Sequence, residues 1–347
     1  MGGDWFDAIP LSSLRTAFVI GDVVGHGLQA TAAMGRLATA VQTLADLDLD
    51  PSELLARLDD LVLRLAAEQD ARQAGSQDDQ SAAAAGAFGA TCLYAIYDPV
   101  SRQCAVASAG HPPPALLRPG ETTACLLDLE PGPPLGIGGM PFETVEVEAP
   151  PGSVLAFYTD GLVSGIASDW SQGTERLVQT LNAGRSAGTP LRRLGHDVTS
   201  ALASTQRRDD AALLLARTRA VSPDDICFQH LRAEESVVAE ARHSVVRQLA
   251  AWGLDELAFT TEIIVSELVT NAIRHAGGPI GLRLIRSSVL VCEVTDSINT
   301  QPRMRRARST DEGGRGLFIV AQLAQRWGSR YGPTGKIIWA EQALPVT

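Results

Sequence analysis

The stretch from Leu14 to Gly27 limits what the amino-terminal half of the chain can fold into. Apolar and β-favouring residues at 17–20 stop just before Asp22, and a Gly-His-Gly sequence at 25–27 leads into an Ala- and Leu-rich helical pattern. This order predicts a buried strand that delivers the Asp22 carboxylate to a glycine-rich turn at the start of a helix. Because an unpaired buried charge is unfavourable, this carboxylate needs a partner.

The periodicity of the chain indicates two domains. A length of 347 residues is enough for two domains of ordinary size. Residues 218–225 contain a Ser-Pro-Asp sequence and lack hydrophobic periodicity, so we place the boundary there. The predicted domains are 1–219 and 231–347, joined by a linker at 220–230.

Alternating and helical patterns predict the elements of each domain. In the first domain we expect helices at 28–47 and 51–69, a loop at 71–86, a hairpin of strands at 91–97 and 104–109, and further strands at 14–20, 115–118, 123–127, 144–149, 154–158 and 211–216. In the second domain we expect helices at 233–252, 255–275 and 317–327, and strands at 280–286, 289–295 and 336–340.

Composition excludes several classes of protein. The net charge of −11 argues against a nucleic-acid partner. The five cysteines have no CxxC spacing and are typical of small core residues in a reducing cytoplasm. No apolar run reaches about 18 residues, and the amino terminus lacks the pattern of a signal peptide. We therefore expect a cytoplasmic protein without a membrane partner.

Four aspartates of the first domain lie at the ends of predicted strands or in a short motif near the amino terminus. Strand ends in a sandwich can converge on one rim, where carboxylates repel one another unless a cation intervenes. Mg²⁺ and Mn²⁺ prefer such all-oxygen ligands. The alternative is that each aspartate caps a turn or a helix, and spacing alone leaves both interpretations open. The four are Asp4, Asp22, Asp160 and Asp209.

Six motifs of the first domain occur in a specific order. They are GGDWFD, GDVVGHG, SAGHPPP, PLGIG, YTDGL and RDDAALL, and they begin at residues 2, 21, 108, 134, 158 and 208. This ordered set resembles the SpoIIE-type branch of the metal-dependent (PPM) serine/threonine protein phosphatases. The resemblance implies an αββα sandwich with two Mn²⁺ or Mg²⁺ ions at one end and a metal-activated water as the nucleophile.

The resemblance also implies a role for each aspartate. Asp22 would bridge both metals with help from the backbone carbonyl of Val23, while Asp160 and Asp209 would bind one metal and Asp4 would support the other. Asp22, Asp160 and Asp209 are thus the expected catalytic residues of this domain. Family members have a strand before the first motif, so we expect Asp4 to lie in a weakly held chain end.

Other polar residues of these motifs receive structural assignments. We expect Asp7 and Asp210 to be local hydrogen-bond partners. His26 and His111 could act as acids, since histidine titrates near neutral pH, but we assign both a structural role. Nucleophilic catalysis by cysteine or by a Ser-His-Asp triad is not supported, because no cysteine lies in a glycine-rich anion loop.

A second polar pattern lies in the predicted helix 255–275. Glu267, Asn271 and His275 are four residues apart and therefore line one stripe of the helix. From spacing alone this could be a solvated polar stripe. Further on, Asp296 follows a strand, and a glycine-rich segment at 312–317 begins a helix, which is a natural phosphate site.

Together these features resemble the Bergerat (GHKL) ATP-binding fold, specifically the small anti-sigma-factor serine kinases. The resemblance covers about residues 233–343 and implies a two-layer α/β domain that binds ATP with Mg²⁺. Asn271 would coordinate the Mg²⁺, Glu267 would act as base, Asp296 would bind the adenine amino group, and Gly314 and Gly316 would let the lid approach the phosphates. Arg303, Arg305, Arg306 and Arg308 lie in the expected lid; they could contact phosphate or an acidic partner, and the default interpretation is a solvated loop. Residues 334–336 match a late segment of the family or form a structural turn, and both interpretations stay open.

We therefore expect an α+β protein with two opposed activities in a bacterial partner-switching pathway. The first domain would dephosphorylate a phosphoserine or phosphothreonine of an anti-sigma-factor antagonist. The second would bind ATP and phosphorylate such an antagonist or hold a sigma factor, and domains of this kind commonly form homodimers. The alternative is an ATP-regulated binding switch with a weak or inactive phosphatase domain.

Overall fold

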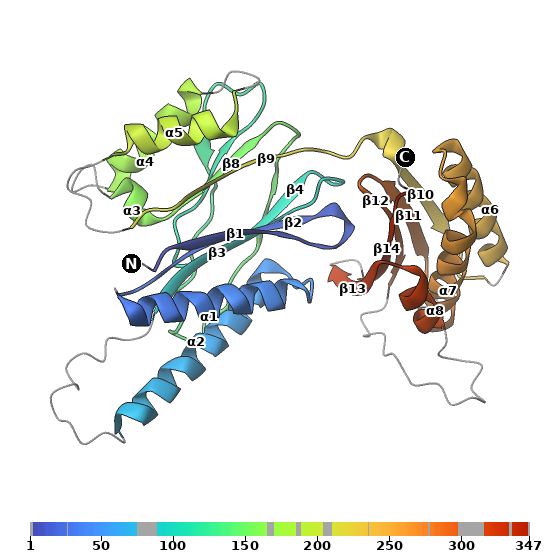
Figure 1. Cartoon of the computed structure of the whole chain (residues 1–347), viewed down its shortest axis with the longest axis horizontal. Helices are drawn as coiled ribbons and strands as arrows, with labels where there is room; N and C mark the ends of the chain where they lie inside the picture. The colour runs from blue at the N-terminus through green and yellow to red at the C-terminus, as the bar shows by residue number, and fades with distance from the viewer. Residues whose placement is uncertain are drawn as a thin grey trace. The chain divides into compact units, whose positions relative to one another are not determined.

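The chain divides into two units, Met1–Ala220 and Val221–Thr347. Figure 1 shows both in the computed structural model. The structure describes residues 3–25, 27–74, 89–164, 170–184, 189–203, 210–234, 236–276, 278–297, 316–332 and 335–345.

The first unit contains two sheets packed face to face. One sheet has the order β1-β2-β3-β4-β7 and the other the order β6-β5-β8-β9, with every neighbouring pair antiparallel. The strands are β1 Trp5–Pro10, β2 Thr16–Val23, β3 Ala90–Tyr97, β4 Gln103–Ala109, β5 Ala115–Leu117, β6 Cys125–Leu126, β7 Val145–Glu148, β8 Val154–Tyr158 and β9 Leu213–Arg217.

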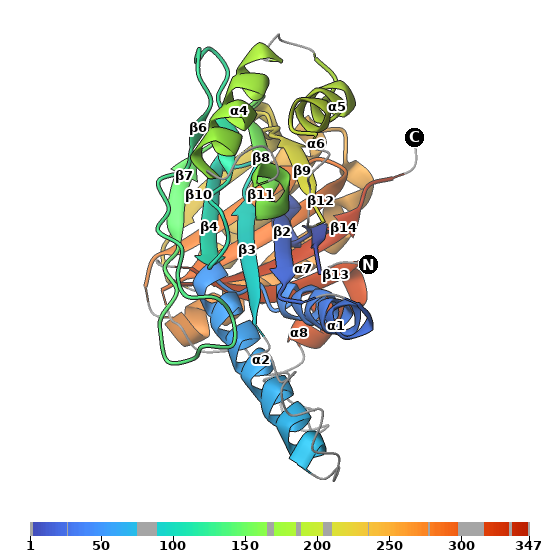
Figure 2. The same cartoon turned by 90° about the vertical axis from the view of Figure 1, so that its left-hand side faces the viewer.

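Helices cover the outer faces of both sheets. One pair lies against the first sheet and the other helices lie against the second, which gives four layers (Figures 1 and 2). This confirms the expected αββα sandwich. The helices are α1 Leu28–Ala45, α2 Pro51–Ala74, α3 Asp160–Val163, α4 Trp170–Ala183 and α5 Leu191–Ala201, and a short 3-10 turn, Ser12–Leu14, joins β1 to β2.

Strand β2 is buried on both faces. Ala17 and Val19 belong to the core beneath α1 and α2, whereas Ile20 belongs to the core between the sheets. On the same inner side, Phe18 stacks on Phe157 of β8 with ring centroids 5.5 Å apart. Because apolar side chains pack on both faces of β2, its sequence is a continuous apolar run and not an alternation of apolar and polar residues. This explains the pattern at 17–20.

The second unit has one antiparallel sheet with helices on one face. The strand order is β10-β11-β12-β14-β13, and α6, α7 and α8 pack against it through a shared core. This confirms the expected two-layer domain. The elements are β10 Ile226–Leu231, α6 Val237–Ala251, α7 Ala258–Ala276, β11 Ile280–Arg286, β12 Val289–Asp296, α8 Gly316–Leu323, β13 Arg326–Gly332 and β14 Gly335–Ala343, with 3-10 turns at Pro223–Asp225 and Asp255–Leu257.

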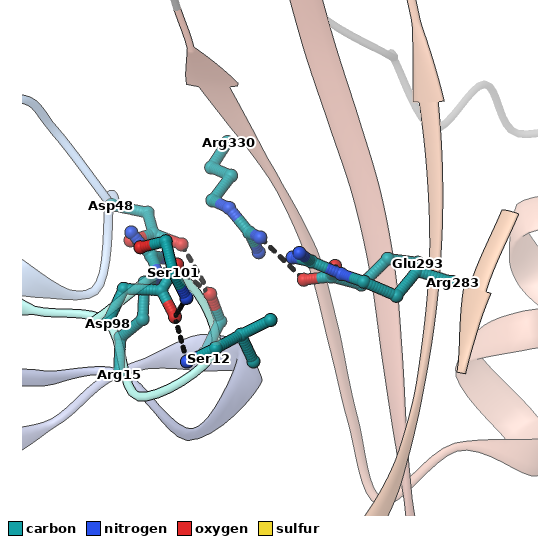
Figure 3. Close-up of polar contacts among 9 residues, drawn as sticks. Ser12, Arg15, Asp48, Asp98, Ser101, Arg283, Glu293 and Arg330 are labelled. Atoms are coloured by element: carbon teal, nitrogen blue, oxygen red, sulfur yellow. Dashed lines mark hydrogen bonds and ion pairs between the residues drawn. The ribbon is translucent and has the colours of Figure 1, made fainter. Parts of the chain in front are cut away.

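Each unit contains its own cluster of hydrogen-bonded charged side chains (Figure 3). In the first unit, Asp48 accepts hydrogen bonds from Ser12 and Arg15, which ties the β1–β2 connection to the segment after α1. In the second unit, Glu293 accepts from Arg283 and Arg330, so one carboxylate links three strands of the sheet. Charge-assisted hydrogen bonds of this kind are the stronger ones.

Three strands differ from the sequence predictions. We did not predict β1 or β10. Residues 226–230, which we placed in the linker, form β10 together with Leu231 and pair with β11. The expected helix at 317–327 was wrong at its end, because α8 stops at Leu323 and Trp327 lies in β13. Backbone bonding explains the change, since the Gln325 N–H donates to the Glu341 carbonyl and enters the ladder with β14.

Within the described residues, no helix combines the length and the apolar character needed to cross a lipid bilayer.

Two helical glycines should respond oppositely to substitution by alanine. A Cβ at Gly173 in α4 would collide with the Val163 carbonyl, whereas a Cβ at Gly35 in α1 would have no neighbour within 4 Å. Gly173→Ala should lower stability by about 1–3 kcal/mol through overpacking. Gly35→Ala should raise it by about 0.5–1 kcal/mol, since alanine favours the helix.

Thermal unfolding of both variants beside the native chain measures the difference. Equal melting temperatures for the two variants would contradict the close approach of α4 to α3.

Candidate functional site

The strand end that carries Asp22 lies against the amino-terminal segment. The Val23 N–H donates to the Gly3 carbonyl at 3.3 Å. A Cβ added to Gly3 would collide with the Val23 carbonyl oxygen and would lie 2.9 Å from a carboxylate oxygen of Asp22. A glycine at position 3 therefore leaves both oxygens open on that side. On the other side β2 pairs with β3, where Asp22 lies opposite Thr91.

The Thr159 hydroxyl joins the same segment to the second sheet. It donates to the Asp4 carboxylate at 2.7 Å and accepts from the Ala212 N–H at 2.8 Å. Thr159 is fully buried and directly precedes Asp160. One hydroxyl thus connects the segment next to Asp22, the end of β8 and the start of the last segment of the unit. We expected Asp4 to lie in a weakly held chain end; in the structure its carboxylate accepts a hydrogen bond from the buried Thr159 hydroxyl.

The buried imidazole of His111 joins the two sheets directly. Nε2 lies 3.1 Å from the Tyr158 carbonyl and Nδ1 lies 2.9 Å from the Thr91 hydroxyl. A carbonyl can only accept, so Nε2 carries the proton and Nδ1 accepts from threonine. Burial lowers the pKa of His111 to about 4, opposed by the bond to the Tyr158 carbonyl. The neutral ring braces the strand beside Asp22 against the strand before Asp160, in agreement with its predicted structural role.

The structure describes three of the remaining predicted residues of this site, and two lie outside the described residues. Asp160 is exposed at the first position of α3, and Asp210 is exposed. Asp7 accepts from the Ala8 N–H and from Gln42, which agrees with its predicted local role. Asp209 and His26 lie outside the described residues.

The oxygen atoms at this rim fit a hard divalent cation in kind. They are carboxylates and one backbone carbonyl, the donors that Mg²⁺ and Mn²⁺ prefer. Glycine at position 3 leaves open the space beside two of them. Across the described residues no three carboxylate, imidazole or thiolate side chains gather closely enough to hold an ion by themselves, and the predicted ligand Asp209 is not among those residues.

Thiolate chemistry has no support at this rim. Burial raises the pKa of both Cys92 and Cys104 to about 12, and a thiol is nucleophilic only when ionised. Both cysteines behave as small apolar residues of the core, as predicted.

In the second unit, α7 carries Glu267 and Asn271 one turn apart. The first residue of α8, Gly316, approaches Glu267 so closely that an added Cβ would collide with its carboxylate. Helix α8 therefore begins beside the polar stripe of α7, with its amino-terminal N–H groups at that end. A helix start next to a carboxylate, with the Asn271 carboxamide one turn further along α7, fits a nucleotide phosphate with its Mg²⁺.

Asp296 lies at the end of β12 opposite Lys336 of β14. Both side chains are buried, and Lys336 Nζ lies 3.0 Å from Asp296 Oδ2. For Asp296 the family resemblance implies a base-binding role, whereas residues 334–336 were expected to match a late family segment or to form a structural turn. Gly314, the lid arginines 303, 305, 306 and 308, and Thr334 lie outside the described residues.

The sequence patterns missed two residues that now stand out, Thr159 and Lys336. Thr159 lies inside the YTDGL motif, so its place before Asp160 was a usable signal. Lys336 is the single lysine of a chain whose other basic residues are arginines. The sequence does not reveal the bonding partner of either side chain, because Asp4 and Asp296 are distant from Thr159 and Lys336 along the chain.

Residues 12–219 match the protein family described as stage II sporulation protein E (SpoIIE), and residues 231–341 match the histidine kinase-like ATPase domain. The crystal structure of the RsbU and RsbW domains of Rv1364c from Mycobacterium tuberculosis is 25% identical to this chain. The match covers 99% of this chain and 88% of that one, with a TM-score of 0.54.

Two further solved structures match the phosphatase part at lower similarity. A structure of the PP2C phosphatase domain and a fragment of the regulatory domain of SpoIIE from Bacillus subtilis is 16% identical, with a TM-score of 0.48, and the match covers 63% of this chain and 60% of that one. The SiaA-PP2C domain of Pseudomonas aeruginosa is 19% identical, with a TM-score of 0.46, covering 62% of this chain and 80% of that one.

The buried His111 should make the first unit less stable in weak acid. Its pKa is lowered from an ordinary 6.5 to about 4, so below 6.5 the unfolded chain binds a proton that the folded chain excludes. The stabilisation present above pH 6.5 is lost as the pH falls toward 4. Between pH 7 and pH 5 this amounts to about 2 kcal/mol.

Urea unfolding at both pH values, followed by hydrogen exchange in β3 and β8, measures this loss. His111→Gln should lower stability at pH 7 and remove this part of the pH dependence. His196→Gln is the matched control, because His196 is exposed on α5, and it should keep the native pH dependence. An unchanged dependence in His111→Gln would contradict the assignment.

Proposed function

Because the chain belongs to the SpoIIE family of PPM protein phosphatases and also contains a histidine kinase-like ATPase domain, we propose that it works in partner switching. The first unit removes phosphate from a phosphoserine or phosphothreonine of an anti-sigma-factor antagonist. The second unit binds ATP and phosphorylates the same class of antagonist. The similarity to a chain with RsbU and RsbW domains supports the pairing of these two activities.

The observation that carries the phosphatase proposal is the convergence at the amino-terminal segment. Gly3 lies against Asp22 and Val23, and Asp4 is bonded to the residue before Asp160. Residues from both sheets are thereby held at one rim, as a two-metal site requires.

We assign the ligands of that site from this chain's own residues. Asp22 would hold both ions with help from the backbone carbonyl of Val23, Asp160 and Asp209 would hold one ion, and Asp4 would support the other. When bound, two Mn²⁺ or Mg²⁺ ions supply positive charge that activates water and neutralises the phosphoryl oxygens. Thr159 and His111 do not touch the substrate; they fix the distance between the two strand ends.

We also assign the residues of an ATP site in the second unit. Asn271 binds the Mg²⁺ that accompanies ATP, and Glu267 receives the proton of the attacking serine hydroxyl. Gly314 and Gly316 allow the segment before α8 to approach the phosphates, while Asp296 accepts from the adenine amino group. The close approach of Gly316 to Glu267 supports a phosphate position beside the base.

The partners follow from the two activities. The antagonist is the shared substrate, a sigma factor is a further ligand of the second unit, and a homodimer is the proposed assembly. Domain boundaries at 219 and 231 remain the proposed limits for separate expression.

Asp22→Asn should abolish most of the phosphatase activity. Removing the charge of a bridging ligand should lower kcat/KM toward a phosphoserine peptide by at least about 100-fold, more than changes in the surroundings of a metal usually cost. The assay uses the full chain with Mn²⁺ and then with Mg²⁺. Asp7→Asn is the matched control on β1, where Asp7 binds Gln42, and it should retain activity.

Equal activity of native and Asp22→Asn chains would contradict the metal phosphatase. If both were inactive and ATP still altered antagonist binding, the binding switch would be the better description.

Asn271→Ala and Glu267→Gln should separate ATP binding from turnover. Loss of the Mg²⁺ ligand should weaken ATP·Mg²⁺ binding by at least about 10-fold, because a hydrogen bond or ligand to a charged group contributes about 1.5–3 kcal/mol. Glu267→Gln should retain ATP binding and lose phosphoryl transfer. Isothermal titration and phosphorylation of a purified antagonist measure the two effects.

Glu262→Gln provides the control on the same helix, since Glu262 pairs with Arg242. Native binding by Asn271→Ala would rule out this nucleotide site.

A further inference from the structure

A groove of about 480 Å³ lies between α4 and β6 in the first unit, where the two elements are side by side (Figure 2). Its lining residues recur every three or four positions of α4, so the groove follows one face of that helix along its length. Trp170, at the start of α4, is 41% exposed, and tryptophan is enriched among residues that dominate binding energy. The lining includes Thr123, Leu126, Trp170, Glu175, Val178 and Asn182.

Strand β6 is an edge strand of its sheet, and part of its backbone points outward. The Leu127 N–H donates to the Pro114 carbonyl next to the β5–β6 ladder. Because bonded and unbonded pairs alternate along antiparallel strands, the N–H and carbonyl groups of Leu126 and Ala124 point away from β5. Asn182 Oδ1 accepts from the Ala124 N–H at 2.6 Å. Within the part of the chain that the structure describes, no residue bonds the outward groups of Leu126.

The groove therefore fits an extended segment of polypeptide. An unpaired strand edge can accept a further strand, which supplies the missing backbone bonds. An apolar side chain of that strand fits against Trp170 and Val178. Among the described residues that line the groove, Glu175 is the one that carries a charge. A basic residue of the added segment complements this carboxylate.

The groove begins close to Asp160. Helix α3 begins at Asp160 and ends at Val163, and a Cβ added to Gly173 of α4 would collide with the Val163 carbonyl. Residues three apart on a helix are separated by about 5 Å. One such step along α3, the contact between the helices and one step back along α4 place Trp170 within roughly 15 Å of Asp160. An extended chain spans that distance in about five residues.

We propose that this groove binds an extended segment of the protein substrate, an inference that rests on the phosphatase activity proposed above. The segment adds beside β6 at least about five residues from the phosphorylated residue. It places an apolar side chain on Trp170 and a basic side chain beside Glu175. The groove then selects the substrate protein without taking part in phosphoryl transfer.

Phosphoserine peptides of different length test the groove in the full chain with Mn²⁺. A short peptide is compared with two peptides that carry about ten further residues, rich in Leu, Val and Arg, on the amino-terminal or the carboxyl-terminal side. One extended peptide should have a KM at least about 10-fold lower at unchanged kcat, because contacts away from the reacting group bind ground state and transition state equally. Replacing its arginines by glutamates should remove most of this gain. N-methylation of its added amides should do the same, since the Leu126 carbonyl then lacks a donor.

Two substitutions in the groove complete the test. Trp170→Ala should raise the KM of the extended peptide to that of the short one and leave kcat and KM for the short peptide unchanged. Glu175→Lys should prefer the glutamate form of the extended peptide. Met140→Ala is the matched control, because Met140 is an exposed apolar side chain of the same unit outside the groove, and it should behave like the native chain.

The outcomes separate this inference from the phosphatase itself. Equal KM values for the short and both extended peptides would overturn the groove and leave the phosphatase standing. If the native chain hydrolyses no peptide, isothermal titration with the unphosphorylated extended peptides decides: binding that Trp170→Ala abolishes supports the groove, and absence of binding overturns it as well. A native dimer that Trp170→Ala converts to a monomer would also overturn it, because a second copy of the chain would then fill the groove.

Discussion

The hydroxyl of Thr159 is the interaction on which the arrangement of the first unit's rim depends. It donates to Asp4 and accepts from the Ala212 N–H, so three segments distant in sequence share one buried oxygen. The His111 imidazole adds a second link between the sheets, from the Thr91 hydroxyl to the carbonyl of Tyr158. Since a buried polar group is costly when unpaired, a shift of any one segment leaves a donor or acceptor unsatisfied. Each of these segments can therefore shift only at the cost of a hydrogen bond.

Sequence patterns predicted the elements whose burial is unambiguous. The run at 17–20 has apolar neighbours on both faces, and it became β2 with Asp22 near its end. The stripe of Glu267 and Asn271 lies on α7, whose start and end were predicted within three residues. In both places one local signal, an apolar run or a helical period, was enough. The roles of these polar residues came from resemblance to families and not from periodicity.

The strands that sequence reasoning missed are edge strands or lie next to the end of a helix. β1 and β10 each pair with one neighbour only, and their partly exposed residues give weak alternation. β13 follows α8 so closely that its first residues extended the helical pattern to Trp327. Their pairing depends on strands far away in the chain, which single-sequence propensity does not contain. The same holds for Thr159 and Lys336, whose partners are distant in sequence.

Both proposed sites are assembled by glycines that act through size. Gly3 lies against Asp22 and Val23, and Gly316 lies against Glu267, yet neither has the positive φ that usually explains a glycine. Of these three glycines, Gly335 combines a close approach, to the Asp296 carbonyl, with a positive φ. A methyl group at either position would be compatible with the local backbone, but it would collide with the Val23 carbonyl at Gly3 and with the Glu267 carboxylate at Gly316. The chemistry of each site thus depends on a missing Cβ, a requirement that arises only when distant segments meet.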